Sequence, residues 1–134
     1  MRVRAFTDGG ARGNPGPAGI GGVVYDMEGN VLAEVSEFIG HTTNNQAEYR
    51  ALIETLKAAK ACGATEVECY MDSQLVAKQM SREYKVKDLN LQKVFIEAYN
   101  LVQEFKSISF THVYREKNKA ADALVNKAID AAIK

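Results

Sequence analysis

The order of strand and helix patterns constrains the fold of this chain most. Three strand patterns come first, over residues 2–7, 20–26 and 31–39, and a Glu28-Gly29-Asn30 turn joins the last two. Helical patterns then alternate with strands, with helices predicted over 44–62, 73–80, 91–105 and 119–133 and strands over 66–71 and 108–113. A meander followed by alternating helices and strands predicts an α/β fold, in which helices flank a mixed sheet.

Local signals mark the ends of several elements. Asn44 or Asn45 is expected to cap the first helix, Gly63 to end it, and Ser73 to cap the second. Residues 8–17 are rich in glycine and hold both prolines, so they predict a structured loop. Residues 81–90 are polar and lack a regular period.

Length and composition restrict the class of protein. A chain of 134 residues, 46% hydrophobic and 25% charged, predicts one globular domain over 1–134, and we expect a monomer. No apolar run is long enough to cross a membrane, and Met1 leads straight into a strand, so we expect no membrane anchor and no signal peptide. Cys62 and Cys69 form no metal-site pattern. A reduced, cytoplasmic protein is expected, and a Cys62–Cys69 disulfide is the less favoured alternative.

The charge balance argues against a strongly electrostatic nucleic-acid binder, because 17 basic residues match 17 acidic ones. Two local basic clusters are nevertheless present: Arg82, Lys85, Lys87 and Lys93 in one, and Arg115, Lys117, Lys119 and Lys127 in the other. Each cluster is explained either as a solvated surface or as a contact to phosphate groups.

Four carboxylates stand out from this framework. Asp8 follows the first strand, Asp72 follows the strand over 66–71, and Asp122 lies in the first turn of the last helix. Each of these three has an ordinary explanation as a turn former or a partner of a helix dipole. Glu48 has no such explanation, because it lies on the same predicted buried stripe as Leu52.

The positions of these acids predict a shared site. Ligands of α/β proteins bind at the carboxyl ends of strands, where Asp8 and Asp72 are both expected. Burying one unpaired carboxylate is costly, whereas several buried together are stable if cations neutralise them. All-oxygen ligand sets favour Mg²⁺, with Mn²⁺ as a substitute, and two such ions about 4 Å apart suit in-line displacement at phosphorus.

Four motifs contain these acids: Phe6-Thr7-Asp8-Gly9-Gly10 with Gly13-Asn14-Pro15-Gly16-Pro17, Thr42-Thr43-Asn44-Asn45-Gln46-Ala47-Glu48, Asp72-Ser73-Gln74-Leu75-Val76, and Asn118-Lys119-Ala120-Ala121-Asp122. In this order, and over essentially the whole chain, the sequence resembles a type 1 ribonuclease H. The resemblance implies a ribonuclease H-like fold, a five-stranded mixed sheet whose first three strands are antiparallel. It also implies that two Mg²⁺ ions assist cleavage of the RNA strand of an RNA–DNA hybrid, which leaves 3′-hydroxyl and 5′-phosphate ends.

The resemblance also implies residue roles. Asp8 would bridge both metal ions, and Asp122 would hold the ion on the nucleophile side. Glu48 and Asp72 would hold the other ion, and Glu48 would also touch a ribose 2′-hydroxyl. The residues implied in substrate binding are Asn14, Asn44 and Gln74 at the RNA minor groove, Thr43 at a DNA phosphate, and Gly9, Gly10, Gly13, Asn45 and Gln46 in the same motifs.

The chain departs from many members of this family in its grip on the DNA strand. Those members carry a basic helix and loop, and residues 81–90 are too few to form one. Tyr84, Lys85 and Lys87 are the candidates for a reduced substitute.

A second departure concerns the group that assists turnover. The family's flexible loop contains glycine and histidine, whereas residues 112–118 of this chain contain no glycine. His112 has the matching spacing to Asp122, and a neutral imidazole can move a proton near neutral pH. Arg115 lies nearer the loop tip and can grip a phosphate with two hydrogen bonds, and we favour Arg115.

Three alternatives to a hybrid-specific nuclease follow from the same residues. The first is a non-catalytic module that binds hybrids or double-stranded RNA, which the presence of all four acids disfavours. The second is an enzyme that also cleaves double-stranded RNA. The third is a phosphotransferase without a nucleic-acid substrate, which the absence of a Gly-x-x-x-x-Gly-Lys phosphate loop disfavours.

Overall fold

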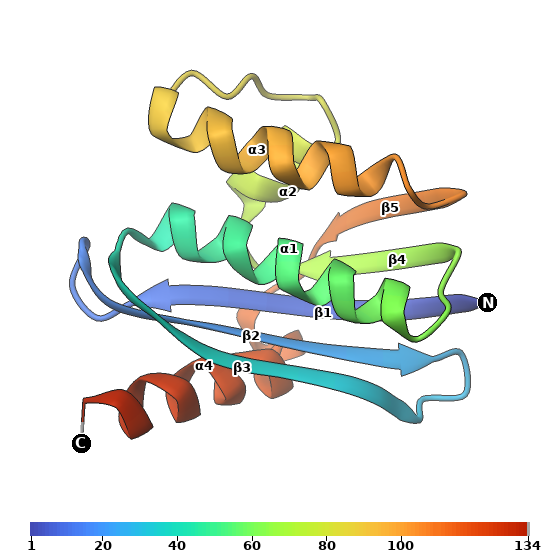
Figure 1. Ribbon diagram of the computed structural model, residues 1–134, viewed down its shortest axis with the longest axis horizontal. Helices are drawn as coiled ribbons and strands as arrows, with labels where there is room; N and C mark the ends of the chain where they lie inside the picture. The colour runs from blue at the N-terminus through green and yellow to red at the C-terminus, as the bar shows by residue number, and fades with distance from the viewer. Residues whose placement is uncertain (134) are drawn as a thin grey trace.

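A computed structural model describes residues 1–133 and shows a five-stranded sheet in the order β3-β2-β1-β4-β5 (Figure 1). The strands are β1 Arg2–Ala11, β2 Gly16–Asp26, β3 Val31–Thr42, β4 Glu66–Met71 and β5 Ser107–His112. The first three pair antiparallel, whereas β4 pairs parallel with both β1 and β5. The prediction of a mixed five-stranded sheet with an antiparallel meander is confirmed.

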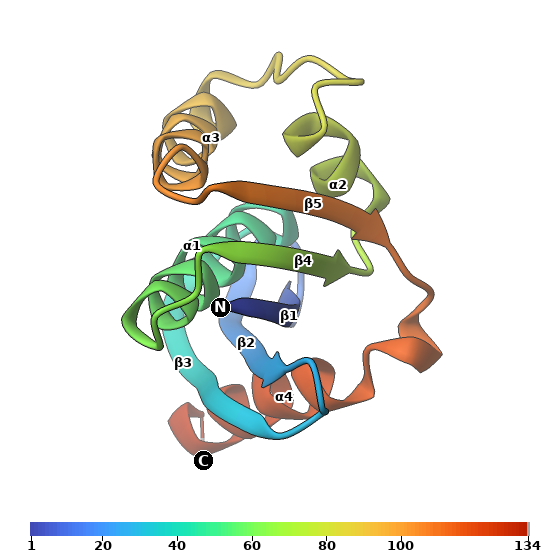
Figure 2. The same ribbon diagram turned by 90° about the vertical axis from the view of Figure 1, so that its right-hand side faces the viewer.

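Helices cover both faces of this sheet (Figure 2). They are α1 Asn44–Ala61, α2 Gln74–Met80, α3 Leu89–Val102 and α4 Lys119–Ala132, and a short 3-10 helix, Arg115–Lys117, precedes α4. Among residues 1–133, no helix combines the length and the hydropathy that crossing a membrane requires.

Two glycines of β2 let α1 and α4 approach the sheet closely. A Cβ atom at Gly21 would overlap the carbonyl group of Ala121 in α4, and one at Gly22 would overlap the side chain of Thr55 in α1. Because consecutive strand residues face opposite sides of a sheet, the two helices clamp β2 between them. Glu48 lies in α1 and Asp122 lies in α4, so these contacts position two of the four acids.

The main core lies between the sheet and α1, α2 and α3. Leu52, Ile53 and Leu56 of α1 are fully buried there, and the stripe that contains Glu48 is buried along its length. The other large contributors are Val3 of β1, Met71 of β4, Val76 and Met80 of α2, and Leu91, Val94 and Leu101 of α3. The predicted helical period of α1 is thus confirmed, and it places Glu48 at the inner end of an apolar face.

The prediction that the first strand ends at Thr7 is wrong. β1 continues to Ala11 because β2 begins at Gly16 and pairs with it as far as Ala11 opposite Ala18. The predicted loop over 8–17 therefore shrinks to residues 12–15. The parallel pairing of β1 with β4 nevertheless stops at Thr7 opposite Met71, so Asp8 is the first residue beyond the parallel part of the sheet.

Other boundaries also differ from the predictions. Thr43, rather than Asn44 or Asn45, caps α1 by accepting a hydrogen bond from the backbone N–H of Gln46. Asp88 caps α3, so this helix begins two residues before the predicted start and ends at Val102. Gly63 ends α1 with a φ of 90°, and Ser73 caps α2, as expected. Both cysteines are free thiols, so the alternative of a disulfide is wrong.

Candidate active site

The structure brings the four predicted carboxylates together. Asp8 of β1, Glu48 of α1 and Asp72, which follows β4, each place one oxygen atom within 4.8 Å of the others. Asp122 lies in the first turn of α4, close enough to Asp8 for a hydrogen bond between the two carboxyl groups. Four separate elements thus meet at one end of the parallel strands.

Local structure explains how Glu48 reaches this point. A Cβ atom at Gly9 would overlap the backbone of Ala47, so the absence of a side chain lets α1 lie directly on β1. The backbone N–H of Gly9 then donates a hydrogen bond to Glu48 Oε1 at 2.5 Å. Gly9 therefore positions a carboxylate as well as lining the cleft, a role that the motif alone did not indicate.

The electrostatics of the cluster are unfavourable without a cation. Burial raises the pKa of Asp8, and the negative charges of Glu48 and Asp72 raise it further. Burial also raises the pKa of Glu48, with Asp72 adding to the effect and the Gly9 N–H opposing it. Within residues 1–133, no Lys or Arg forms an ion pair with Asp8, Glu48 or Asp72. Uncompensated carboxylate oxygens this close together fit a hard divalent cation such as Mg²⁺ or Mn²⁺.

The raised pKa values predict how stability changes with pH in the absence of metal. A carboxyl group whose pKa is higher in the folded state is more protonated there, so its contribution to stability is lost as pH rises. The free energy of unfolding of the protein in EDTA should therefore fall between about pH 5 and about pH 8. Urea titrations should show this fall, and Asp8→Asn should flatten it.

Asp26→Asn is the matched control for this effect. Asp26 is the last residue of β2, where hydrogen bonds from Asn30 lower its pKa, so its replacement should not flatten the fall. An equal flattening by both variants would show that the pH dependence does not originate in the acidic cluster.

The two candidate helpers of turnover both border the same cleft. The cleft has a volume of about 410 Å³ and is lined by Asp8, Gly9, Asn44, Asn45, Glu48, Asp72, Ser73 and residues 112–115. His112 is the last residue of β5 and pairs opposite Met71, so it lies in the sheet as expected. Arg115 begins the 3-10 helix, is largely exposed, and places Nη2 3.5 Å from Asp122 Oδ1.

Hydrogen bonds hold Asn14, Asn44 and Gln46, which are among the predicted substrate-binding residues. Asn14 Oδ1 accepts a hydrogen bond from the backbone N–H of Asn44 at 3.0 Å, and Asn44 Oδ1 accepts one from Ala11 at 2.8 Å. Gln46 Nε2 donates to the carbonyl of Asn90 at 2.9 Å. These bonds tie the β1–β2 hairpin and the start of α3 to the start of α1.

The other predicted substrate-binding residues do not share one location. Asn14, Thr43, Asn45 and Gln46 line a second cleft of about 480 Å³ beside α3. Gln74 is exposed at the start of α2, and it lies outside the lining of both clefts. Gly10 and Gly13 lie in β1 and in the hairpin turn, and Gly13 has a φ of 91°, which a larger residue would adopt only with strain.

The sequence did not predict a functional position for Asn118. This residue is 1% exposed, and its Nδ2 donates to the carbonyl of Thr7, the residue before Asp8, at 2.9 Å. Its own carbonyl accepts from the backbone N–H of Asp122 at 3.1 Å. An asparagine before a helix is a common cap, but here the side chain makes no capping bond and instead ties α4 to β1.

Comparisons with known proteins agree with this geometry. A family description named "Reverse transcriptase-like" matches residues 6–128. Ribonuclease HI of Halobacterium salinarum is 46% identical over 131 residues, which are 98% of this chain and 66% of that protein. The crystal structure of LC11-RNase H1 in complex with an RNA/DNA hybrid has a TM-score of 0.94 and 48% identity, over 98% of this chain and 99% of that one.

The fold and the four converging carboxylates define an α/β protein with an acidic site suited to divalent cations. With these relatives, the chain belongs to the type 1 ribonuclease H family. Only residues 81–88 separate α2 from α3, too few for the basic helix and loop that many members carry. The bifunctional protein Rv2228c of Mycobacterium tuberculosis is also 49% identical over 133 residues, and the chain spans only 36% of its length.

Proposed function

We propose that this protein is a metal-dependent endoribonuclease that hydrolyses the RNA strand of RNA–DNA hybrids and leaves 3′-hydroxyl and 5′-phosphate ends. The observation that carries the proposal is the meeting of Asp8, Glu48 and Asp72 within 4.8 Å, with Asp122 beside Asp8. The hybrid substrate is supported by LC11-RNase H1, whose structure contains an RNA/DNA hybrid.

The four carboxylates would divide between two cations, Mg²⁺ or Mn²⁺. Asp8 would bridge both ions, Asp122 would hold the one on the nucleophile side, and Glu48 and Asp72 would hold the other. The bound ions would supply an activated water and stabilise the leaving oxygen. The Gly9 N–H fixes the Glu48 carboxylate, and Asn118 fixes the start of α4 against β1, so the chain holds its ligands in place before a cation binds.

Selection of RNA would rest on groups that meet the sugar edge. Asn14, Asn44, Gln74 and Glu48 would contact 2′-hydroxyls or base edges, and Gly9, Gly10 and Gly13 would admit the backbone closely. Asn45 and Gln46 line the cleft that also contains Asn14. Thr43 would contact a DNA phosphate, because its hydroxyl accepts from Gln46 and still has a proton to donate.

A cleavage panel tests the proposal. End-labelled hybrid, double-stranded RNA and double-stranded DNA of one sequence are incubated with the protein, with and without Mg²⁺ or Mn²⁺. The RNA of the hybrid should be cut only with metal, and double-stranded DNA should stay intact. Weak cutting of double-stranded RNA would mark a side activity, whereas binding of the hybrid without any cutting would favour a non-catalytic module.

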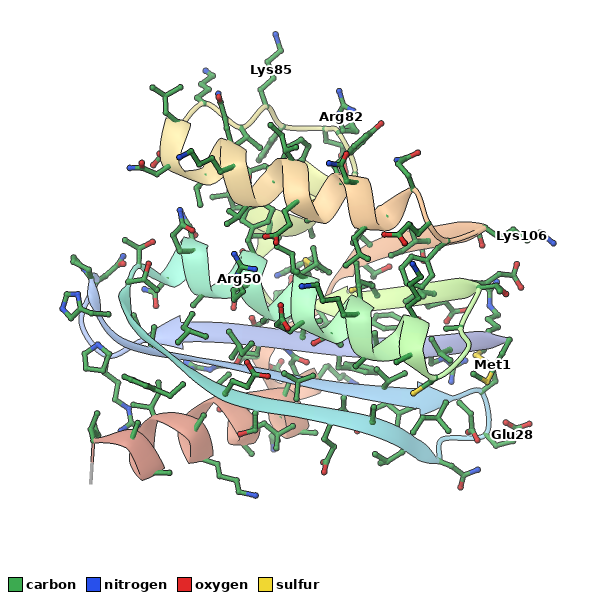
Figure 3. The ribbon with its side chains drawn as sticks, in the orientation of Figure 1. Met1, Glu28, Arg50, Arg82, Lys85 and Lys106 are labelled. Atoms are coloured by element: carbon green, nitrogen blue, oxygen red, sulfur yellow. The ribbon has the colours of Figure 1, made fainter. Side chains whose placement is uncertain are left out.

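The basic segment between α2 and α3 would supply a reduced grip on the hybrid. Figure 3 shows Lys85 projecting away from the sheet, with Arg82 on the same segment. Lys85→Ala with Lys87→Ala should weaken hybrid binding modestly and flatten its dependence on salt, because fewer phosphates are neutralised. Anisotropy titrations at several salt concentrations measure both quantities.

Lys57→Ala with Lys106→Ala removes the same charge elsewhere and is the control for that experiment. Both lysines are remote from the segment between α2 and α3, in α1 and before β5. Identical binding curves for the wild type and the Lys85/Lys87 variant would show that these lysines are only solvent-exposed and make no contact with the hybrid.

Arg115 is proposed as the group that assists turnover. Its guanidinium lies beside Asp122, is exposed, and can bind the departing phosphate at any working pH. Arg115→Ala should lower the turnover number by about ten-fold or more, within the range for one positioned group. His112→Ala should cost less, because the strand restricts this side chain, and Lys117→Ala in the same segment is the control. A larger loss for His112→Ala in a folded protein would reverse the ranking.

A further inference from the structure

A buried hydrogen bond joins α1, which contains Glu48, to α2, which follows Asp72 in the chain. Tyr49 Oη donates to Gln79 Oε1 at 2.5 Å, and the two residues are 0% and 4% exposed. Tyr49 follows Glu48 in α1, and α2 begins two residues after Asp72. The bond therefore connects the helix that carries one acid to the helix that follows another.

The core does not need polar groups at this point. α2 already packs Val76, Ala77 and Met80 into it, and Phe95 of α3 meets the Tyr49 ring edge-on at 6.4 Å. An apolar pair of similar shape would fill the same space without the desolvation of a hydroxyl and an amide. Burial raises the pKa of Tyr49, so the phenol keeps its proton and stays a donor.

The Tyr49–Gln79 hydrogen bond depends on orientation, whereas apolar contacts do not. α2 has seven residues, and hydrophobic contacts alone allow so short a helix to rotate or slide. Within residues 1–133, no second hydrogen bond and no ion pair joins α1 to α2, since the ion pairs of α1 run within it or to α3 and the residues after α3. The Tyr49–Gln79 bond therefore fixes the orientation of α2 against α1.

We propose that Tyr49 and Gln79 are positioning residues that set the separation of Glu48 and Asp72 and thereby the affinity of the site for divalent cations. The inference rests on the proposed function, because it requires that the acids bind a cation. Mg²⁺ demands nearly ideal ligand geometry, so a small rotation of α2 that moves Asp72 would weaken binding. Partners behind metal ligands commonly influence affinity in this way.

Calorimetric titration of Mg²⁺ into the whole chain, without nucleic acid, tests the inference. Tyr49→Phe removes the donor, and Gln79→Met removes the acceptor. Each should weaken Mg²⁺ binding by about five-fold, somewhat less than the loss typical for a direct partner of a metal ligand. Each should also lower the melting temperature by several degrees, because a buried polar group loses its partner.

Tyr70→Phe is the matched control. It also removes a hydroxyl that donates a hydrogen bond, to Glu68 Oε1 at 3.0 Å, but Tyr70 stacks on Phe6 on the sheet face away from α1. Its Mg²⁺ affinity should equal that of the wild type.

The double variant Tyr49→Phe with Gln79→Met separates positioning from stability. The apolar pair should recover most of the melting temperature, whereas Mg²⁺ binding should stay weak because nothing directional replaces the bond. Recovery of the affinity together with the melting temperature would overturn the inference, as would single variants that bind Mg²⁺ like the wild type. If the wild type itself bound no Mg²⁺, the proposed function would fail instead.

Discussion

Asp8→Asn is expected to lower the rate of hybrid cleavage by about 100-fold or more, because it removes the negative charge that would hold both cations. The amide has nearly the shape of the carboxylate, so the fold should persist. Without metal, the melting temperature should hold or rise, since one of several crowded like charges is gone. Single-turnover cleavage of a labelled hybrid and thermal melts in EDTA measure the two effects.

Asp130→Asn is the control for that variant. Asp130 pairs with Arg12 on the exposed side of α4, away from the acidic cluster, and its loss should leave cleavage unchanged. Cleavage by Asp8→Asn at nearly the wild-type rate would rule out the assignment of two cations to these acids.

A run of deoxyribonucleotides in the RNA strand should protect that run from cleavage. If Asn14, Asn44, Gln74 and Glu48 contact 2′-hydroxyls, a run of about four deoxyribonucleotides leaves these groups without partners. A site built to bind a hydroxyl rejects an analogue that lacks it, so cutting within the run should fall by about 100-fold or more. Mapping the cut positions on a sequencing gel gives the result directly.

The flanking ribonucleotides of the same strand provide the internal control. They should be cut at their usual rates, which would show that the enzyme is active and bound. Cuts distributed evenly across the run and its flanks would refute recognition of the RNA strand through 2′-hydroxyls.

Periodicity predicted the parts of the site that depend on burial. Glu48 interrupts an apolar stripe on α1, and a charge at such a position needs a cation or a partner, which is why this residue was the most informative of the four. The alternation of strands and helices likewise predicted the sheet that brings Asp8 and Asp72 to one edge.

Pairing and contacts between distant elements could not be predicted in the same way. The end of β1 depends on how far β2 pairs with it. The glycine-rich segment 8–17 gave no local signal that this pairing continues to Ala11. The roles of Asn118 and of the Tyr49–Gln79 pair depend on partners far away in the sequence. Local patterns therefore gave no role to either feature.

The most direct test of the central claim is cleavage of one RNA–DNA hybrid before and after metal is restored. The protein is stripped with EDTA, mixed with hybrid labelled on the RNA strand, and then given Mg²⁺ in excess. We expect no cleavage in EDTA and prompt cleavage of the RNA strand, with 5′-phosphate ends, once Mg²⁺ is present. Cleavage at the same rate in EDTA, or an intact hybrid after Mg²⁺ is added, would contradict the claim that the protein is a metal-dependent ribonuclease acting on hybrids.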